Sequence, residues 1–119
     1  MIKILIASDH AGFFLKNKLI NYFKKKFEFI DFGTHSEESV DYPDFAHKLA
    51  NEISTKNISG VLICGSGVGM SMVANRYKNV RAALCFNENM AKLSRQHNDA
   101  NILVLGSRLI SFDEAIKCF

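Results

Sequence analysis

A glycine-rich segment, Gly65-Ser66-Gly67-Val68-Gly69, directly follows the apolar run Val61-Leu62-Ile63-Cys64. Glycines let the main chain approach a ligand closely, and the amides at the start of a helix can hold an anion. The spacing does not match a nucleotide-phosphate loop, because no lysine with serine or threonine follows, nor the dinucleotide fingerprint. Two interpretations stay open: a tight turn between strand and helix, or a site for an anion or oxyanion.

Cys64 stands immediately before this loop, and its position suggests chemistry. A thiol at the start of a helix is favoured as the thiolate, which acts as a nucleophile or a base. The alternative is an inert cysteine in a buried strand. Cys85 also ends an apolar run, but no glycine loop follows it, so we interpret it as a core residue. We interpret Cys118 as incidental.

Two histidine-containing pairs are further candidates. Asp9-His10 follows the first apolar run, and Asp9 is either a helix N-cap or part of a carboxylate–imidazole pair that transfers protons. His97-Asn98 precedes a predicted strand, where a helix C-cap with an exposed histidine is the simpler interpretation. In a single subunit His97 is expected far from Cys64, so it can join that site only through loop geometry or from a second subunit. His35 and His47 show no sign of a partner, and His47 is expected to be exposed.

The elements that must position these residues alternate regularly along the chain. Strands are predicted over 2–8, 27–32, 61–64, 81–86 and 102–105. Between them, Leu15, Leu19 and Phe23 recur every four residues with Lys16 and other polar residues in between, which is typical of an amphipathic helix. A second helix starts at Pro43, and the capping box Ser111–Glu114 starts a last one. Apolar strands alternating with helices indicate a three-layer α/β/α fold with a Rossmann-like, five-stranded parallel sheet.

In such a sheet, ligands bind beyond the carboxyl ends of the strands, where the strand order reverses. If the first and third strands flank that point, the Asp9-His10 loop and the Cys64 loop face each other. The apolar side of the last helix, formed by Phe112, Ala115, Ile116 and Phe119, is expected to dock on the sheet or on a partner subunit.

Composition restricts the classes of protein. With 119 residues, 48% of them hydrophobic and 23% charged, the chain is expected to be one domain spanning 1–119. No signal peptide and no apolar run of about 18 residues, the length of a membrane span, is present. The three cysteines are widely spaced, so they do not match the spacing of a zinc site, and they favour a reduced, cytoplasmic location.

The run Lys24-Lys25-Lys26 is interpreted as a solvated helix end rather than a nucleic-acid patch.

An ordered set of short motifs covers nearly the whole chain, from residue 2 to about 117. It resembles the family of sugar-phosphate isomerases that includes the type B ribose-5-phosphate, galactose-6-phosphate and allose-6-phosphate isomerases. The motifs are Ser8-Asp9-His10-Ala11-Gly12, Asp41-Tyr42-Pro43, Cys64–Gly69, Ala74-Asn75, Leu93–Asn101 and Gly106-Ser107-Arg108.

The resemblance implies an aldose–ketose isomerase of the pentose phosphate pathway. It would interconvert ribose 5-phosphate and ribulose 5-phosphate through an enediolate, without cofactor or metal. It also implies a homodimer or a dimer of dimers with active sites between subunits, which would let His97 act across the interface. By this resemblance, Cys64 is the base, Ser66 assists it, and the amides of Gly65, Gly67, Val68 and Gly69 bind the enediolate. Asp9 and His97 open the sugar ring. His10 and Arg108 bind the sugar or its phosphate, and Tyr42 and Asn98 line the pocket.

Other family features leave alternatives open. One branch of the family uses a glutamate where this chain has Met70, which favours the cysteine branch. Relatives usually continue with a tail whose arginines hold the phosphate, so Arg108, with His10 and Arg81, is expected to carry more of that binding here. The alternatives are a galactose-6-phosphate or allose-6-phosphate isomerase or one of its subunits, and a non-enzymatic phosphate-binding module of flavodoxin-like type.

Overall fold

Five strands alternate with five helices along the chain, as the hydrophobic pattern predicts. The computed structural model describes residues 1–119. The bounds of the strands and helices are β1 Ile2–Ser8, α1 Phe13–Phe23, β2 Phe27–Asp31, α2 Tyr42–Thr55, β3 Ser59–Cys64, α3 Val68–Ala74, β4 Ala82–Leu84, α4 Glu88–Asn98, β5 Ile102–Gly106 and α5 Phe112–Cys118.

All neighbouring strands are parallel, and the order across the sheet is β2-β1-β3-β5-β4. From β1 the chain therefore passes to β2 at one edge of the sheet and then returns past β1 to β3. Strand β4 forms the other edge, and β5 lies between β3 and β4. The strand order reverses between β1 and β3, as predicted. A flavodoxin-like sheet has the order 2-1-3-4-5. Here the fourth and fifth strands have exchanged places, so the flavodoxin-like alternative is wrong at the level of topology.

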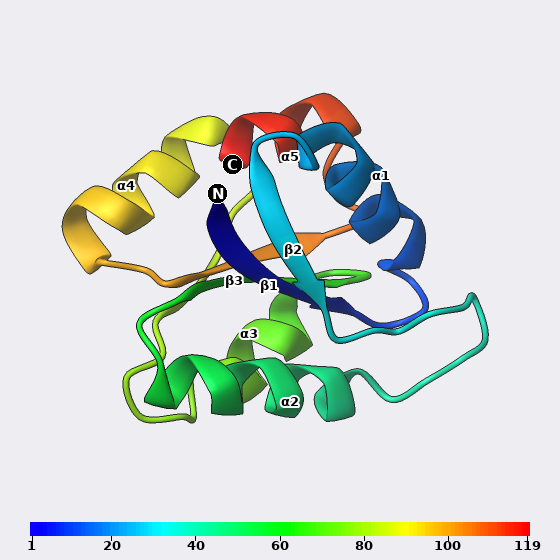
Figure 1. The fold of residues 1–119 in the computed structure, drawn as a ribbon, viewed down its shortest axis with the longest axis horizontal. Coiled ribbons are helices and arrows are strands. Elements are labelled where there is room, and N and C mark those ends of the chain that lie inside the picture. Colours follow the sequence, from blue (N-terminus) through cyan, green and yellow to red (C-terminus); the bar gives the residue numbers. More distant parts are fainter.

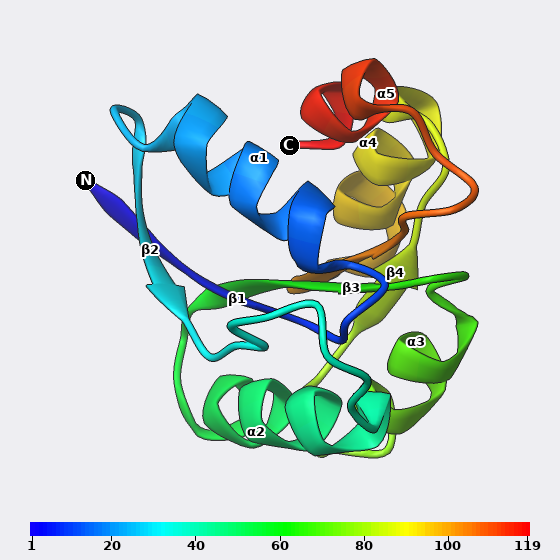
Figure 2. The ribbon, with the colours of Figure 1, turned by 90° about the vertical axis from the view of Figure 1, so that its right-hand side faces the viewer.

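Helices cover both faces of the sheet, which confirms the three-layer α/β/α prediction. In Figures 1 and 2, α2 and α3 lie below the sheet, and α1, α4 and α5 lie above it. The strands separate two buried clusters, because successive side chains point to opposite faces. Leu5 and Ala7 of β1 face the first cluster, whereas Ile4 and Ile6 face the second. No helix combines the length and the apolar character that crossing a bilayer would require.

Some element boundaries differ from those predicted. The strand predicted over 81–86 spans only Ala82–Leu84. Helix α4 starts at Glu88, because the Asn87 side chain accepts a hydrogen bond from the Met90 amide. At the other end, the Ser111 hydroxyl accepts from the Glu114 amide, as the capping box predicts.

Helix α5 docks on its own chain rather than requiring a partner. Phe119 stacks on Phe23 at 4.7 Å between ring centroids, and Phe112 packs edge-on against Tyr22 at 5.9 Å. Cys118 is buried in the same cluster, so its interpretation as incidental is wrong. Cys85 is also buried there, which confirms its assignment to the core.

Candidate active site

Cys64 is the last residue of β3 and is held by the neighbouring strand. It pairs with Gly106 of β5, and its carbonyl accepts a hydrogen bond from the Ser107 amide at 2.8 Å. Its side chain is only 5% exposed. The Gly67 amide donates to Sγ at 3.1 Å. An N–H group that donates to sulfur favours the thiolate, so this geometry suits a base or nucleophile.

The glycine loop turns sharply and leaves amide groups free. Gly67 has a φ of 79°, which favours glycine, and starts α3. Its amide is engaged by Cys64, and the Val68 amide donates to the Ser66 hydroxyl at 3.2 Å. The amides of Gly65, Ser66 and Gly69 donate to no group of the chain. The segment is thus a tight turn that also presents free donors beside a thiol.

The loop after β1 lies next to this segment, as expected. Ser8 pairs with Ile63, and the Asp9 amide donates to the Ile63 carbonyl at 3.2 Å. Because adjacent strands are about 4.8 Å apart, Asp9 and Cys64 leave the sheet as direct neighbours. Asp9 is not the N-cap of α1, since that position belongs to Gly12. Its Oδ1 atom instead accepts from the Gly12 amide at 3.0 Å, and the side chain is buried.

His10 has a defined hydrogen-bonding state. Its Nδ1 atom accepts from the Val40 amide at 3.2 Å. An imidazole nitrogen that accepts a hydrogen bond carries no proton, so the neutral ring has its proton on Nε2. His10 therefore presents an N–H donor on the side away from Val40.

Tyr42 and Arg108 reach the glycine loop from two other elements. A Cβ atom on Gly69 would lie 2.5 Å from the Tyr42 ring, and one on Gly65 would lie 2.9 Å from Nη1 of Arg108. The two glycines therefore let an aromatic ring and a guanidinium group rest on the main chain. One edge of the sheet thus gathers Asp9, His10, Tyr42, Cys64–Gly69 and Arg108.

Two predicted site residues lie at the opposite edge. His97 and Asn98 end α4, are exposed, and precede the start of β5. Ile102 pairs with Gly60 at the amino end of β3, whereas Cys64 pairs with Gly106. These four residue steps separate the two edges by about 13 Å. In one subunit His97 is therefore far from Cys64, as expected.

Arg81 also lies at the amino edge, where its amide donates to Oδ1 of Asn101 at 2.8 Å. It is thus far from Arg108 in the same chain.

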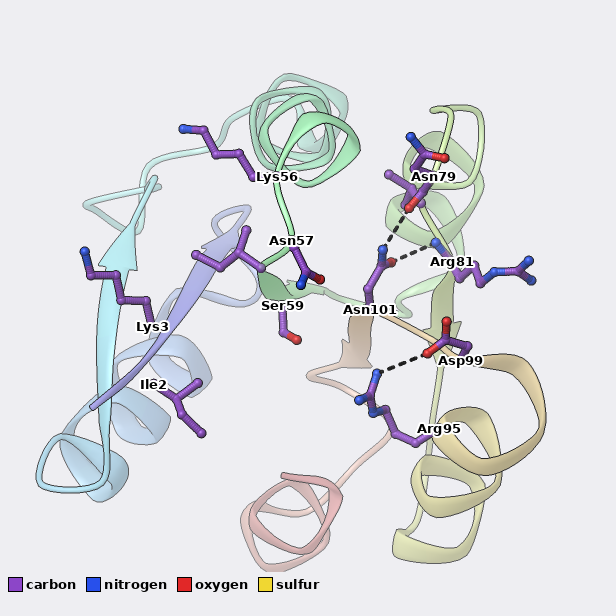
Figure 3. A pocket seen from close by; sticks show the side chains of 12 residues that line it. Ile2, Lys3, Lys56, Asn57, Ser59, Asn79, Arg81, Arg95, Asp99 and Asn101 are labelled. Carbon is purple, nitrogen blue, oxygen red and sulfur yellow. Dashed lines mark hydrogen bonds and ion pairs between the residues drawn. The ribbon is translucent and has the colours of Figure 1, made fainter.

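A cavity of about 860 Å³ opens at this amino edge (Figure 3). Its lining is mostly polar and includes four basic side chains, and Arg95 lies 4.0 Å from Asp99 within it. Apart from Arg81, none of the predicted catalytic or binding residues lines it. Size alone therefore does not locate the predicted site, most of whose residues gather at the carboxyl edge.

Some side chains behave differently from the sequence expectations. Lys16, expected among the solvated residues of α1, is fully buried and forms an ion pair with Asp31. His47 is exposed, as predicted, but it has a partner, since Nδ1 lies 2.7 Å from the Tyr77 hydroxyl. Met70 is fully buried in the core. No group of three or more histidine, cysteine or carboxylate side chains is arranged to hold a metal ion.

Comparison with known proteins gives one consistent result. The chain is 50% identical over 109 residues to a putative sugar phosphate isomerase of Rickettsia bellii, covering 90% of this chain and 76% of that protein. The solved ribose-5-phosphate isomerase B of Clostridium thermocellum superposes with a TM-score of 0.95 at 49% identity, covering 98% and 80% of the two chains.

A third relative was solved with a bound sugar phosphate. Ribose-5-phosphate isomerase B of Mycoplasma genitalium, with bound ribulose-5-phosphate, superposes with a TM-score of 0.94 at 43% identity, again covering 98% and 80%. The family model described as Ribose/Galactose Isomerase matches residues 4–119. With nearly its full length matched, this chain belongs to the Ribose/Galactose Isomerase family.

Proposed function

We propose that this protein interconverts ribose 5-phosphate and ribulose 5-phosphate at the carboxyl edge of its sheet, with Cys64 as the base. The observation that carries the proposal is the sulfur of Cys64, which accepts the Gly67 amide beside loop amides that have no acceptor in the chain. The relative with bound ribulose-5-phosphate supports the same sugar phosphate as substrate here.

The reaction moves one proton between two carbon atoms. The Cys64 thiolate removes the proton from C2 of the open-chain aldose, and the C2–H electron pair forms the C1–C2 double bond while the C1 oxygen becomes negative. The resulting thiol then gives its proton to C1, while the proton on O2 moves to the negative C1 oxygen as the C2 carbonyl forms, which restores the thiolate. Free amides at Gly65, Ser66 and Gly69 are placed to stabilise the enediolate oxygens, and the Ser66 hydroxyl to assist the proton transfers.

Ribose 5-phosphate enters the reaction as a closed ring, which must open first. The Asp9 carboxylate, held beside Cys64, and His97 are assigned to this proton transfer between the ring oxygen and the C1 hydroxyl. Since His97 lies at the other edge of its own sheet, this assignment requires His97, with Asn98, to come from a second copy of the chain.

An exposed apolar surface supports such a dimer. Val68 and Met72, one turn apart on α3, are 43% and 67% exposed beside the glycine loop. Apolar side chains grouped on a surface are typical of protein interfaces. We therefore propose a homodimer, or a dimer of dimers, in which each active site is composed of residues from two subunits.

The remaining residues are assigned to substrate binding. Arg108, whose guanidinium rests on Gly65, and the Nε2–H group of His10 are suited to anionic or hydroxyl oxygens. Tyr42 and the partner's Asn98 would line the pocket. The step needs no cofactor, because the sugar is oxidised at one carbon and reduced at the next. The three free thiols are compatible with a cytoplasmic location, which we keep as part of the proposal.

Replacing Cys64 by alanine tests the assignment of the base. Cys64→Ala should lower turnover of ribose 5-phosphate by about 10²–10⁴-fold, the range of a positioned acid–base group, while binding of a substrate analogue persists. Cys85→Ala is the matched control, since that thiol lies in the core, and it should keep its turnover. Near-normal activity of Cys64→Ala would reject the assignment. Galactose 6-phosphate and allose 6-phosphate should be poorer substrates in the same assay.

A further inference from the structure

The buried polar side chains of this protein all gather around one catalytic candidate. Apart from cysteines, the only buried polar or charged residues are Ser8, Asp9, Lys16 and Thr34. They come from the end of β1, from α1 and from the loop after β2. Burying such groups costs free energy unless they are paired. The Asp9 and Lys16 side chains are paired, whereas the Ser8 hydroxyl has no hydrogen-bond partner.

The centre of this arrangement is an ion pair between α1 and β2. Nζ of Lys16 lies 2.8 Å from Oδ1 and 2.6 Å from Oδ2 of Asp31, and Lys16 is 0% exposed. A lysine is almost never fully buried unless it is paired. Well-packed apolar residues often stabilise a protein as much as a buried ion pair does, so the pair is better explained by the geometry it imposes than by stability.

Hydrogen bonds connect the pair to Asp9 from two sides. On one side, Oδ1 of Asp31 accepts from the Gly33 amide at 2.8 Å, and the Gly33 carbonyl accepts from the Ser8 amide at 2.7 Å. On the other side, the Lys16 amide donates to the Gly12 carbonyl at 2.9 Å. The Gly12 amide in turn donates to Oδ1 of Asp9 at 3.0 Å. Together with the peptide bond between Ser8 and Asp9, these interactions form a closed ring of contacts. Its members are Lys16, Asp31, Gly33, Ser8, Asp9 and Gly12.

The same ion pair fixes the start of the loop from Phe32 to Asp41. Thr34 of this loop donates its amide to the Ser8 carbonyl at 2.8 Å, which adds a second bond to the end of β1. Near its other end, Val40 donates to His10. Asp9 and His10 are thus held between α1 and this loop, and both depend on where the Lys16–Asp31 pair places them.

We propose that Lys16 and Asp31 are positioning residues for ring opening. The buried pair holds the Asp9 carboxylate in the orientation that it needs to transfer a proton to or from the sugar ring. It has no part in the proton transfer by Cys64, which β3 and β5 position independently. This inference rests on the proposed function, since that function gives Asp9 its role.

The chemistry of the two substrates separates these steps. Ribose 5-phosphate closes a five-membered ring through O4, so its conversion requires ring opening. Ribulose 5-phosphate has a phosphate on O5 and cannot close such a ring, so Cys64 can remove its C1 proton directly. Two rates are therefore measured for each variant: conversion of ribose 5-phosphate, and uptake of deuterium from D₂O into C1 of ribulose 5-phosphate.

Lys16→Met should split these two rates. Conversion of ribose 5-phosphate should fall by about 10²-fold, the low end of what a positioned acid–base group contributes, while deuterium uptake stays near the wild-type rate. Cys64→Ala should lose both. Lys56→Met is the matched control, because it breaks the exposed ion pair with Glu52, and it should change neither rate.

A parallel loss of both rates in Lys16→Met, or no loss of either, would overturn the proposal. If that variant does not fold, Lys16→Met combined with Asp31→Leu, which removes both charges together, is measured in the same way. Full conversion of ribose 5-phosphate by that double variant, or an equal loss of both its rates, would overturn the proposal too. A wild-type protein with neither rate would instead reject the proposed function.

Discussion

The three thiols of this protein sit in different electrostatic surroundings. The pKa of Cys118 is raised from its ordinary value of 9.0 to about 11, chiefly by burial and also by the nearby Cys85, Glu114 and Glu88. Burial also raises the pKa of Cys85, although a hydrogen bond with Ser94 opposes that shift. At neutral and mildly alkaline pH both thiols are therefore protonated. The sulfur of Cys64, in contrast, lies at the glycine loop, where it accepts a hydrogen bond from the Gly67 amide.

This difference predicts selective alkylation. At pH 8, iodoacetamide should modify Cys64 and inactivate the enzyme, because only the thiolate is a good nucleophile and the raised pKa values keep Cys85 and Cys118 protonated. Peptide mapping by mass spectrometry at increasing times gives the modified residue, and saturating ribulose 5-phosphate should slow the reaction. Inactivation that tracks the labelling of Cys118 instead would contradict this assignment.

Arg108 should determine the affinity for the phosphate. A charge-assisted hydrogen bond contributes roughly 1.5–3 kcal/mol, so Arg108→Ala should raise the KM for ribose 5-phosphate by about one to two powers of ten with a smaller change in kcat. Lys56→Ala, which removes an exposed positive charge paired with Glu52, is the control and should leave KM unchanged. Equal effects of the two substitutions would show that Arg108 has no special position.

At the scale of elements, the site depends on the close approach of β5 to the glycine loop. A Cβ atom on Gly106 would lie 2.5 Å from the carbonyl oxygen of Ser66, a backbone atom that cannot move alone. Gly106→Ala should therefore lower the free energy of unfolding by about 1–3 kcal/mol, the usual cost of overpacking, and should reduce kcat as the loop shifts.

Gly60→Ala provides the comparison for this substitution. Its Cβ atom would meet the end of the flexible Leu49 side chain at 2.8 Å, at the opposite end of β3 from Cys64. It should cost less stability and preserve kcat. Thermal unfolding and steady-state kinetics of both variants give these values, and a normal kcat in Gly106→Ala would show that the loop tolerates the displacement.

Helix α1 shows how far elements can be predicted from the sequence. The repeat of Leu15, Leu19 and Phe23 correctly predicts an amphipathic helix, since apolar periodicity reports which side faces the core. The same pattern places Lys16 in solvent, because a lysine is usually exposed. Its partner Asp31 is fifteen residues away and belongs to another element. Local periodicity carries no information on such a contact, so the buried ion pair could not be predicted.

At the scale of the whole molecule, the composite active site can be tested by mixing subunits. Cys64→Ala and His97→Ala should each be inactive alone. After verified subunit exchange, a mixed dimer contains one site with both residues intact and should regain part of the wild-type activity. Mixed Cys64→Ala and Asp9→Ala subunits are the control, because both changes lie at the same edge of one chain. That dimer has one defect in each of its two sites and should stay inactive, and no recovery with His97→Ala would contradict the shared site.

The sheet edges also explain which site residues were predictable. Asp9, Cys64 and Arg108 each follow a strand, and the carboxyl ends of parallel strands meet at one edge, so their grouping follows from the α/β pattern. His97 could be linked to them only through a resemblance to known enzymes, since no intrachain contact exists to detect. The exchange of β4 and β5 was likewise unpredictable, because local sequence does not encode which neighbour a strand chooses.

The strand order has a consequence for the dynamics of the active site. The three strands whose loops carry Asp9, Cys64 and Arg108 are β1, β3 and β5, and each has a neighbour on both sides. The two edge strands, β2 and β4, have only one neighbour each. Local opening of a structure begins where few hydrogen bonds must break, so fraying should concentrate in β2 and β4. The carboxyl ends of β1, β3 and β5 can therefore keep their alignment while β4 fluctuates, and the Lys16–Asp31 ion pair ties the carboxyl end of β2 to α1.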